Sequence, residues 1–103
     1  KYKEVSKFPE VRRDLALLVD NEVLFSDLQS IALRTDKNLL KEVSLFDVYQ
    51  GDKVAEGKKS YALSFLFRDK EKTLTDKVVD KAILNIFKSL ERQLKAELRD
   101  GTL

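Results

Sequence analysis

Cysteine and histidine are both absent from the 103 residues of this chain. Without cysteine there can be no disulfide, thiolate metal site, iron–sulfur cluster or cysteine nucleophile. Without histidine the chain lacks the usual general base near neutral pH and every serine–histidine triad. The commonest protein ligands of zinc and copper are therefore also missing from this chain. A cytoplasmic location fits the lack of cysteine, and we expect the chain to work there.

Methionine is also missing, even at position 1, and the first residues do not have the basic, apolar and small-residue order of a secretory signal. We therefore expect residues 1–103 to be a single domain, cut from a longer protein. Its apolar runs are far shorter than the roughly 20 residues that a membrane-spanning helix needs. A chain of this length can bury roughly 60–65% of its unfolded surface, which is enough for one core and predicts a globular domain without a membrane partner.

The charge is nearly balanced, with 20 basic against 18 acidic side chains and a net charge of +2. A strong electrostatic nucleic-acid binder has a much more basic composition. Any contact with RNA must therefore depend on local clusters of basic residues.

Apolar periodicity predicts six elements in alternating order. Strands are expected over 11–19, 40–49, 58–67 and, more briefly, 96–99. A first helix is expected from about Asp27 to Thr35, with Ser26 and Gln29 as its capping box. A longer helix of about 18 residues, near 27 Å, should follow a cap at Thr73 or Thr75. This order is that of an α+β ferredoxin-like fold, βαββαβ, with a four-stranded antiparallel sheet and two helices on one face.

One face of such a sheet stays open to water, a partner or a ligand. The second strand has apolar residues at both parities, which we interpret as contact on both faces. In the third strand Tyr61 shares its parity with the core residues Leu63, Phe65 and Phe67. We expect the open face to carry Asp14, Ala16, Leu18, Asp47, Tyr49, Ser60, Ala62 and Ser64.

An aromatic ring among small and hydrogen-bonding residues suits an unpaired nucleic-acid base. Stacking on Tyr49 is worth about 1–3 kcal/mol per base, while Asp47 and Ser60 can bond the base edge. The alternative is that Tyr49 is an ordinary cross-strand packing residue. Asp14 and Asp47 are carboxylates, but no acidic cluster has a recognisable metal-ligand spacing, so we expect no metal.

Basic residues gather near the expected platform and are candidates for phosphate contacts. The candidates are Arg12, Arg13, Lys58 and Lys59, with Lys53, Arg68, Lys70 and Lys72 in neighbouring loops. Acidic residues are interleaved among them, so a solvated surface of mixed charge is the alternative. For Arg13 we favour an ion pair with Asp14 over a contact with RNA.

Several separated motifs together resemble one known family, the ferredoxin-fold anticodon-binding domain at the C-terminus of the bacterial phenylalanyl-tRNA synthetase β subunit. They are FP-x-x-x-RD-L-A over 8–16, L-F-D-x-Y-x-G over 45–51, G-K-K-S over 57–60, Phe67-Arg68, T-L-T-D over 73–76 and the closing Leu98-Arg99. The resemblance covers essentially the whole chain.

The resemblance implies that this domain binds the anticodon stem-loop of phenylalanine tRNA. It also implies that the first anticodon base stacks on Tyr49, with Asp47, Ser60 and Ala16 around it. The domain itself would be non-catalytic and without a cofactor, and DNA is not an expected partner. Its parent would be a phenylalanine–tRNA ligase using ATP and magnesium, in which the rest of the β subunit and an α subunit assemble as α2β2.

Three alternatives share this topology. A ligand-sensing or oligomerisation module would pair through its sheet and ignore RNA. An acylphosphatase-like enzyme needs an anion-binding loop after the first strand, where residues 20–22 are acidic. An RNA-recognition motif would direct Tyr61 toward RNA, but its parity places Tyr61 in the core.

Overall fold

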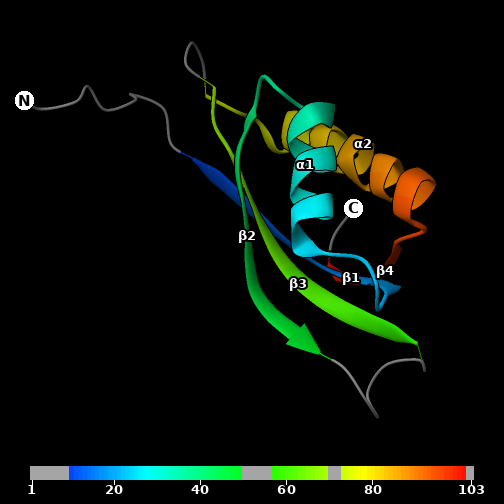
Figure 1. Cartoon of the computed structure of the whole chain (residues 1–103). Helices are drawn as coiled ribbons and strands as arrows, with labels where there is room; N and C mark the ends of the chain where they lie inside the picture. The colour runs from blue at the N-terminus through cyan, green and yellow to red at the C-terminus, as the bar shows by residue number, and fades with distance from the viewer. Residues whose placement is uncertain (1–9, 50–56, 70–72, 102–103) are drawn as a thin grey trace, which may run out of the picture.

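The computed structural model describes residues 10–49, 57–69 and 73–101. Its elements follow the expected order (Figure 1): β1 (Val11–Asp20), α1 (Phe25–Thr35), β2 (Leu40–Tyr49), β3 (Lys58–Phe67), α2 (Asp76–Leu94) and β4 (Glu97–Gly101). The predicted strands over 11–19, 40–49 and 58–67 are confirmed almost residue for residue. The last strand begins and ends slightly later than its predicted range of 96–99. No helix in the described ranges has the length and apolar character to cross a bilayer.

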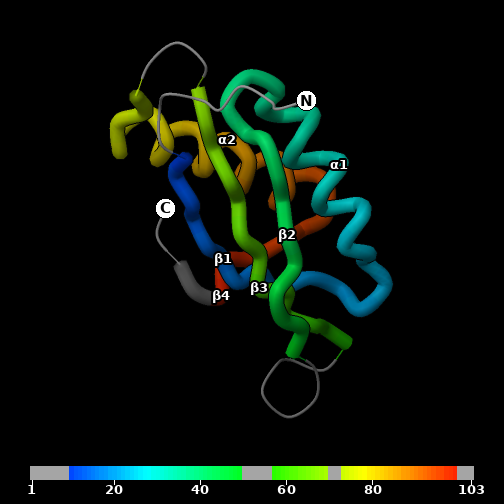
Figure 2. Tube along the Cα trace, turned by 90° about the vertical axis from the view of Figure 1, so that its left-hand side faces the viewer, coloured from blue at the N-terminus to red at the C-terminus, as the bar shows by residue number. Residues whose placement is uncertain are grey.

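The four strands form one antiparallel sheet in the order β2-β3-β1-β4. Both helices lie on the same side of it in Figure 1, and Figure 2 looks onto the other side, with the helices behind the strands. This is the ferredoxin-like α+β architecture. The sheet therefore has one covered face and one bare face.

The core lies between the helices and the covered face. Alternate residues of β1 and β3 are buried there because successive strand side chains point to opposite faces. They are Leu15, Leu17, Val19, Tyr61, Leu63, Phe65 and Phe67. The helices contribute Leu28, Ile31, Ala32, Val79, Ala82, Ile83, Ile86 and Leu90, with Phe87 and Leu94 packed at the margin. Tyr61 belongs to this core, as its parity predicts, and its hydroxyl donates to the carbonyl of Val23 (2.8 Å).

The start of α1 differs from the prediction. The helix begins at Phe25 with Leu24 in the N-cap position, which has no side-chain cap bond. The carboxylate of Asp27 reaches back and accepts the backbone N–H of Leu24 (3.2 Å). Gln29 does not complete a capping box with Ser26; its amide donates to the carbonyl of Val43 in β2 (3.2 Å). Gln29 therefore joins the helix to the sheet.

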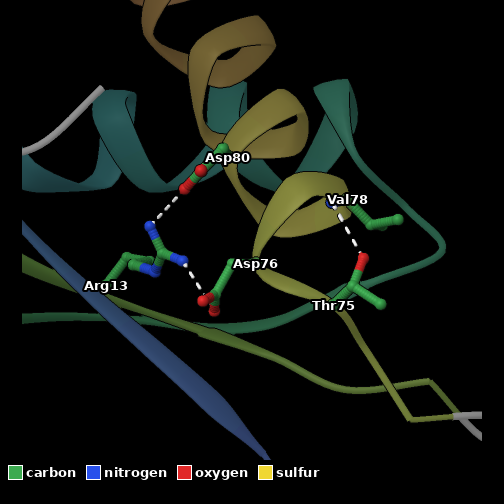
Figure 3. A network of polar contacts seen from close by, with 5 residues as sticks. All are labelled: Arg13, Thr75, Asp76, Val78 and Asp80. Carbon is green, nitrogen blue, oxygen red and sulfur yellow. Dashed lines mark hydrogen bonds and ion pairs between the residues drawn. The ribbon is translucent and has the colours of Figure 1, made fainter.

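The start of α2 confirms one of the two predicted caps. Thr75 accepts the backbone N–H of Val78 on its side-chain oxygen (3.3 Å; Figure 3), which satisfies one of the free donors of the first turn. The helix runs for 19 residues to Leu94, and the C-cap residue Lys95 adopts the left-handed conformation with φ of 56°. Such a residue turns the chain sharply, and β4 begins two residues later.

Two irregularities in β2 decide which way its side chains point. Its register against β3 shifts between Leu40 and Glu42 and again between Leu45 and Asp47. Strict alternation would put Asp47 on the same face as Val43 and Leu45, which pack into the core. The extra residue at the second shift, Phe46, reverses the facing of everything after it.

The interpretation that β2 is contacted on both faces is therefore wrong. Its apolar residues occur at both parities because the bulges change the parity of the covered face, so that Leu40, Val43 and Val48 all lie on the helix side. Phe46 is the exception, with 60% of its surface exposed.

Candidate nucleic-acid interface

The bare face brings together the four residues that the sequence singles out. Tyr49 lies directly opposite Ser60, and Asp47 lies opposite Ala62, which in turn lies opposite Ala16 on β1. Residues opposite one another in an antiparallel pair project to the same face. Asp47, Tyr49, Ser60 and Ala16 therefore surround one small area that spans three strands.

The floor of this area is buried although no helix covers it. Ser60 has no exposed surface and Ala62 is 6% exposed. Tyr49 stands above them with 39% of its surface exposed. Within the described part of the chain, the hydroxyl of Ser60 has no hydrogen-bond partner. A buried hydroxyl without a partner is uncommon and calls for an explanation.

The phenol of Tyr49 interacts electrostatically with its neighbours. The hydrogen bond that the Tyr49 hydroxyl donates to the Asp47 carboxylate raises the pKa of Tyr49, as does the negative charge of that carboxylate. Partial burial raises it further, while the cation of Arg99 lowers it. The net direction is upward. Tyr49 therefore keeps its proton at neutral pH and presents an uncharged ring with a hydroxyl donor.

Arg99 is a site residue that sequence reasoning missed. Its guanidinium carbon lies 5.5 Å from the centre of the Tyr49 ring, within cation–π distance. Because β4 and β2 form opposite edges of the sheet, the Arg99 side chain reaches over the bare face. The Leu98-Arg99 ending belongs to the family motifs, but only the tertiary structure brings Arg99 to Tyr49.

Two of the expected phosphate contacts are engaged within the protein. Lys58 forms an ion pair with Asp20 (2.9 Å) and lies 4.0 Å from Glu97. Its hydrogen bond to Asp20 raises the pKa of Lys58, although burial opposes the shift. Lys59 is buried and sits 4.8 Å from the centre of the Tyr61 ring. Neither ammonium group is free at the platform.

Arg13 lies on the covered face, away from the platform (Figure 3). It pairs with Asp80 and, at 3.4 Å, with Asp76, both in the first turns of α2. The expected ion pair with Asp14 is wrong because adjacent strand residues project to opposite faces. Arg13 instead fastens β1 to the long helix.

Arg12 is the remaining candidate of the four and lies on the bare face opposite Leu66. Across the described residues, no ion pair or side-chain hydrogen bond engages it. Arg68 pairs with Glu10 (3.5 Å). Lys53, Lys70 and Lys72 fall outside the described residues, as do Phe8 and Gly51 of the family motifs.

Among the residues that the structure describes, carboxylates predominate on the bare face. By register and contact, its acidic side chains are Asp14, Asp20, Glu42, Asp47 and Glu97, and its basic ones are Arg12, Lys58 and Arg99. Because Lys58 is held by two of those carboxylates, Arg99 is the cation nearest to Tyr49 that is not held in an ion pair among the described residues. A polyanion approaching Tyr49 would therefore depend strongly on Arg99.

A family model described as the ferredoxin-fold anticodon binding domain matches residues 6–99. The chain belongs to this family. The match runs through all of the platform residues, from Ala16 on β1 to Arg99 on β4. The fold and the family therefore agree over nearly the whole length of this anticodon binding domain.

Similar proteins bear a consistent name. The chain is 57% identical over 98 residues to the phenylalanine–tRNA ligase beta subunit of Bacteroides fragilis, which covers 95% of this chain and 12% of that protein. It is 48% identical over 97 residues to the subunit of the same name from Porphyromonas gingivalis, a match that covers 94% of this chain and 12% of that protein. It is 50% identical over 99 residues to the subunit of the same name from Clostridium tetani, a match that covers 96% of this chain and 12% of that protein. The anticodon binding domain thus spans about an eighth of the length of these relatives.

Proposed function

We propose that this chain is the tRNA-binding module of a bacterial phenylalanine–tRNA ligase β subunit and that it recognises the anticodon stem-loop of phenylalanine tRNA. Family membership and the names of the similar proteins support the proposal. The complete enzyme would act in the cytoplasm as an α2β2 assembly, joining phenylalanine to its tRNA with ATP and magnesium. This domain would contribute recognition and no catalytic group.

The observation that carries the proposal is the pairing of a half-exposed ring with a buried, unpartnered hydroxyl. Tyr49 supplies a surface on which an unpaired base can stack, since every base has a flat aromatic face. Ser60 offers a hydrogen bond that nothing described in the protein satisfies, and Asp47 can accept from a base N–H. Ala16, half-buried on the neighbouring strand, leaves room for the base edge.

This arrangement supports selection of the base as well as its binding. Stacking on Tyr49 gives affinity to any base, whereas the carboxylate of Asp47 rewards a base that presents N–H donors and repels one that presents only acceptors. We propose that the first anticodon base occupies this site. A base with a different edge would leave the Ser60 hydroxyl without a bond or set an acceptor against the Asp47 carboxylate, and either would weaken its binding.

The test is a titration of the chain with two RNA hairpins at low salt. One hairpin carries the anticodon loop of phenylalanine tRNA and the other differs only in the first anticodon base. Tyr49→Ala should weaken binding of the matched hairpin by roughly 5- to 150-fold, the equivalent of about 1–3 kcal/mol of stacking, and should remove most of the preference. Tyr49→Phe keeps the ring and should retain most of the affinity.

Val48→Ala is the matched control because Val48 is the neighbouring residue on the opposite face of β2. It should leave binding unchanged, and circular dichroism should confirm that each variant is folded. If Tyr49→Ala still distinguishes the two hairpins, the assigned site is incorrect. A chain that binds neither hairpin and instead self-associates would favour an oligomerisation module on the same fold.

A further inference from the structure

We propose that Arg99 is a second RNA-contacting residue of this site and that it exchanges partners when RNA binds. In the free chain its guanidinium rests on the Tyr49 ring. The entering base takes that place on the ring, and the released guanidinium pairs with a phosphate of the same loop. This inference rests on the proposed function and names a contact that the motif residues do not include.

The geometry of the free chain supports the first part. The guanidinium carbon lies over the ring at 5.5 Å from its centre, within the range of a cation–π interaction. A base stacked on the ring would have its own centre about 4.5–7 Å from the ring centre, which is the space that the guanidinium already occupies. The base and the guanidinium therefore cannot lie over the same part of the ring together. Stacking on this face of Tyr49 therefore requires Arg99 to move.

The cost of moving Arg99 is small because its only described partner is the ring. It makes no ion pair with the described carboxylates, unlike Lys58, which Asp20 and Glu97 hold in place. A long side chain anchored on the edge strand β4 can swing over the bare face without any change in the sheet. Stacking of the base on the ring then offsets the lost cation–π contact.

The charge of the face supports the second part. A loop of RNA brings phosphates close to Asp47 and the other carboxylates of the bare face, which repel them. Arg99 is the nearest cation that can offset this repulsion, and its planar fork matches two phosphate oxygens. We therefore assign its final position to a phosphate rather than to a base edge.

The contact in the free chain can be measured without RNA. In NMR spectra, the ring current of Tyr49 should displace the Arg99 side-chain resonances from their ordinary positions. Tyr49→Leu should return them to those positions, and so should saturation with the matched hairpin. Arg99 resonances that are unaffected by Tyr49→Leu would overturn the first part of the proposal.

The phosphate contact is tested by the salt dependence of hairpin binding. Arg99→Gln should weaken binding of the matched hairpin roughly tenfold at low salt, as expected for a lost charge-assisted bond. It should also reduce the slope of log affinity against log salt by about 0.7, the value for one phosphate contact on a single strand. Arg99→Lys should keep the slope because it keeps the charge. Arg92→Gln, an exposed change on α2, should alter neither quantity.

Each outcome separates the two proposals. If Tyr49→Ala removes discrimination while Arg99→Gln binds equally well or better, Arg99 only covers the ring and this inference fails alone. Weaker binding of Arg99→Gln with an unchanged slope would overturn the phosphate contact. If the unsubstituted chain does not distinguish the hairpins, the proposed function fails and this inference fails with it.

Discussion

Ser60→Ala should make the protein more stable and a poorer RNA binder. The hydroxyl of Ser60 is buried, with no exposed surface and no described partner. Keeping a hydroxyl out of water without a hydrogen bond costs about 1–3 kcal/mol in proteins. Removing one oxygen leaves a void smaller than a methyl group, which offsets at most about 1 kcal/mol. We therefore expect the free energy of unfolding to rise by about 1 kcal/mol.

Urea unfolding followed by circular dichroism measures this change, and a rise of 1 kcal/mol corresponds to about 4–8 °C in Tm for a domain near this size. Ser64→Ala is the matched control. Ser64 lies on the same strand and face but is half-buried, so its hydroxyl can bond water, and the change should be close to neutral.

The same substitution should weaken the matched hairpin by roughly 2- to 12-fold, because a bond of about 0.5–1.5 kcal/mol is lost. Gained stability combined with lost discrimination would identify Ser60 as a residue kept for binding. A Ser60→Ala variant that unfolds at lower urea than the parent would refute this reasoning, because it would mean that the hydroxyl already has a partner in the free protein.

Three further predictions concern the frame around the site. Asp80→Asn should lower the free energy of unfolding by up to about 1 kcal/mol, because Asp80 is half exposed where it pairs with Arg13. Salt screens such a pair, so the loss should be smaller at high salt. Urea unfolding at two salt concentrations would measure the loss, and a loss that does not depend on salt would contradict this prediction. Thr75→Ala should cost about 1 kcal/mol through the lost cap of α2, and an unchanged thermal midpoint would argue against that bond. Lys58→Met should be less stable than the parent at neutral pH. Because folding raises the pKa of Lys58, the stabilisation by Asp20 is fully present below the ordinary lysine value of 10.5 and disappears as pH rises through the higher folded-state value. A stability difference that does not shrink at all as the pH rises above 10.5 would be inconsistent with it.

The strands were predictable because their side chains alternate against a single core. Tyr61, Leu63, Phe65 and Phe67 give β3 an unbroken pattern, and the structure follows it from Lys58 to Phe67. The start of α1 was less predictable because Leu24 has no capping oxygen. The cap comes from Asp27, three residues later, and residues near a helix start compete for that role.

The site was only partly predictable for a different reason. The register confirms the expectation that Tyr49, Asp47, Ser60 and Ala16 share the open face, although strict alternation along β2 would have placed the first two with its core residues. The local sequence does not predict the bulge at Phe46, because the register of β2 is set by its pairing with β3. The Arg99 contact depends on the relative positions of two sheet edges, which a linear sequence does not display.

The bulge at Phe46 makes one strand serve two surfaces. Before it, Val43 and Leu45 pack into the interior; after it, the residues of the same parity, Asp47 and Tyr49, lie on the bare face. A substitution on either side can therefore be tolerated or rejected independently of the other. Because Leu45 and Asp47 pair with the adjacent residues Leu63 and Ala62, the ladder skips Phe46. A register that paired Phe46 as an ordinary strand residue would turn Tyr49 toward the helices and remove the platform without changing a single residue that forms it.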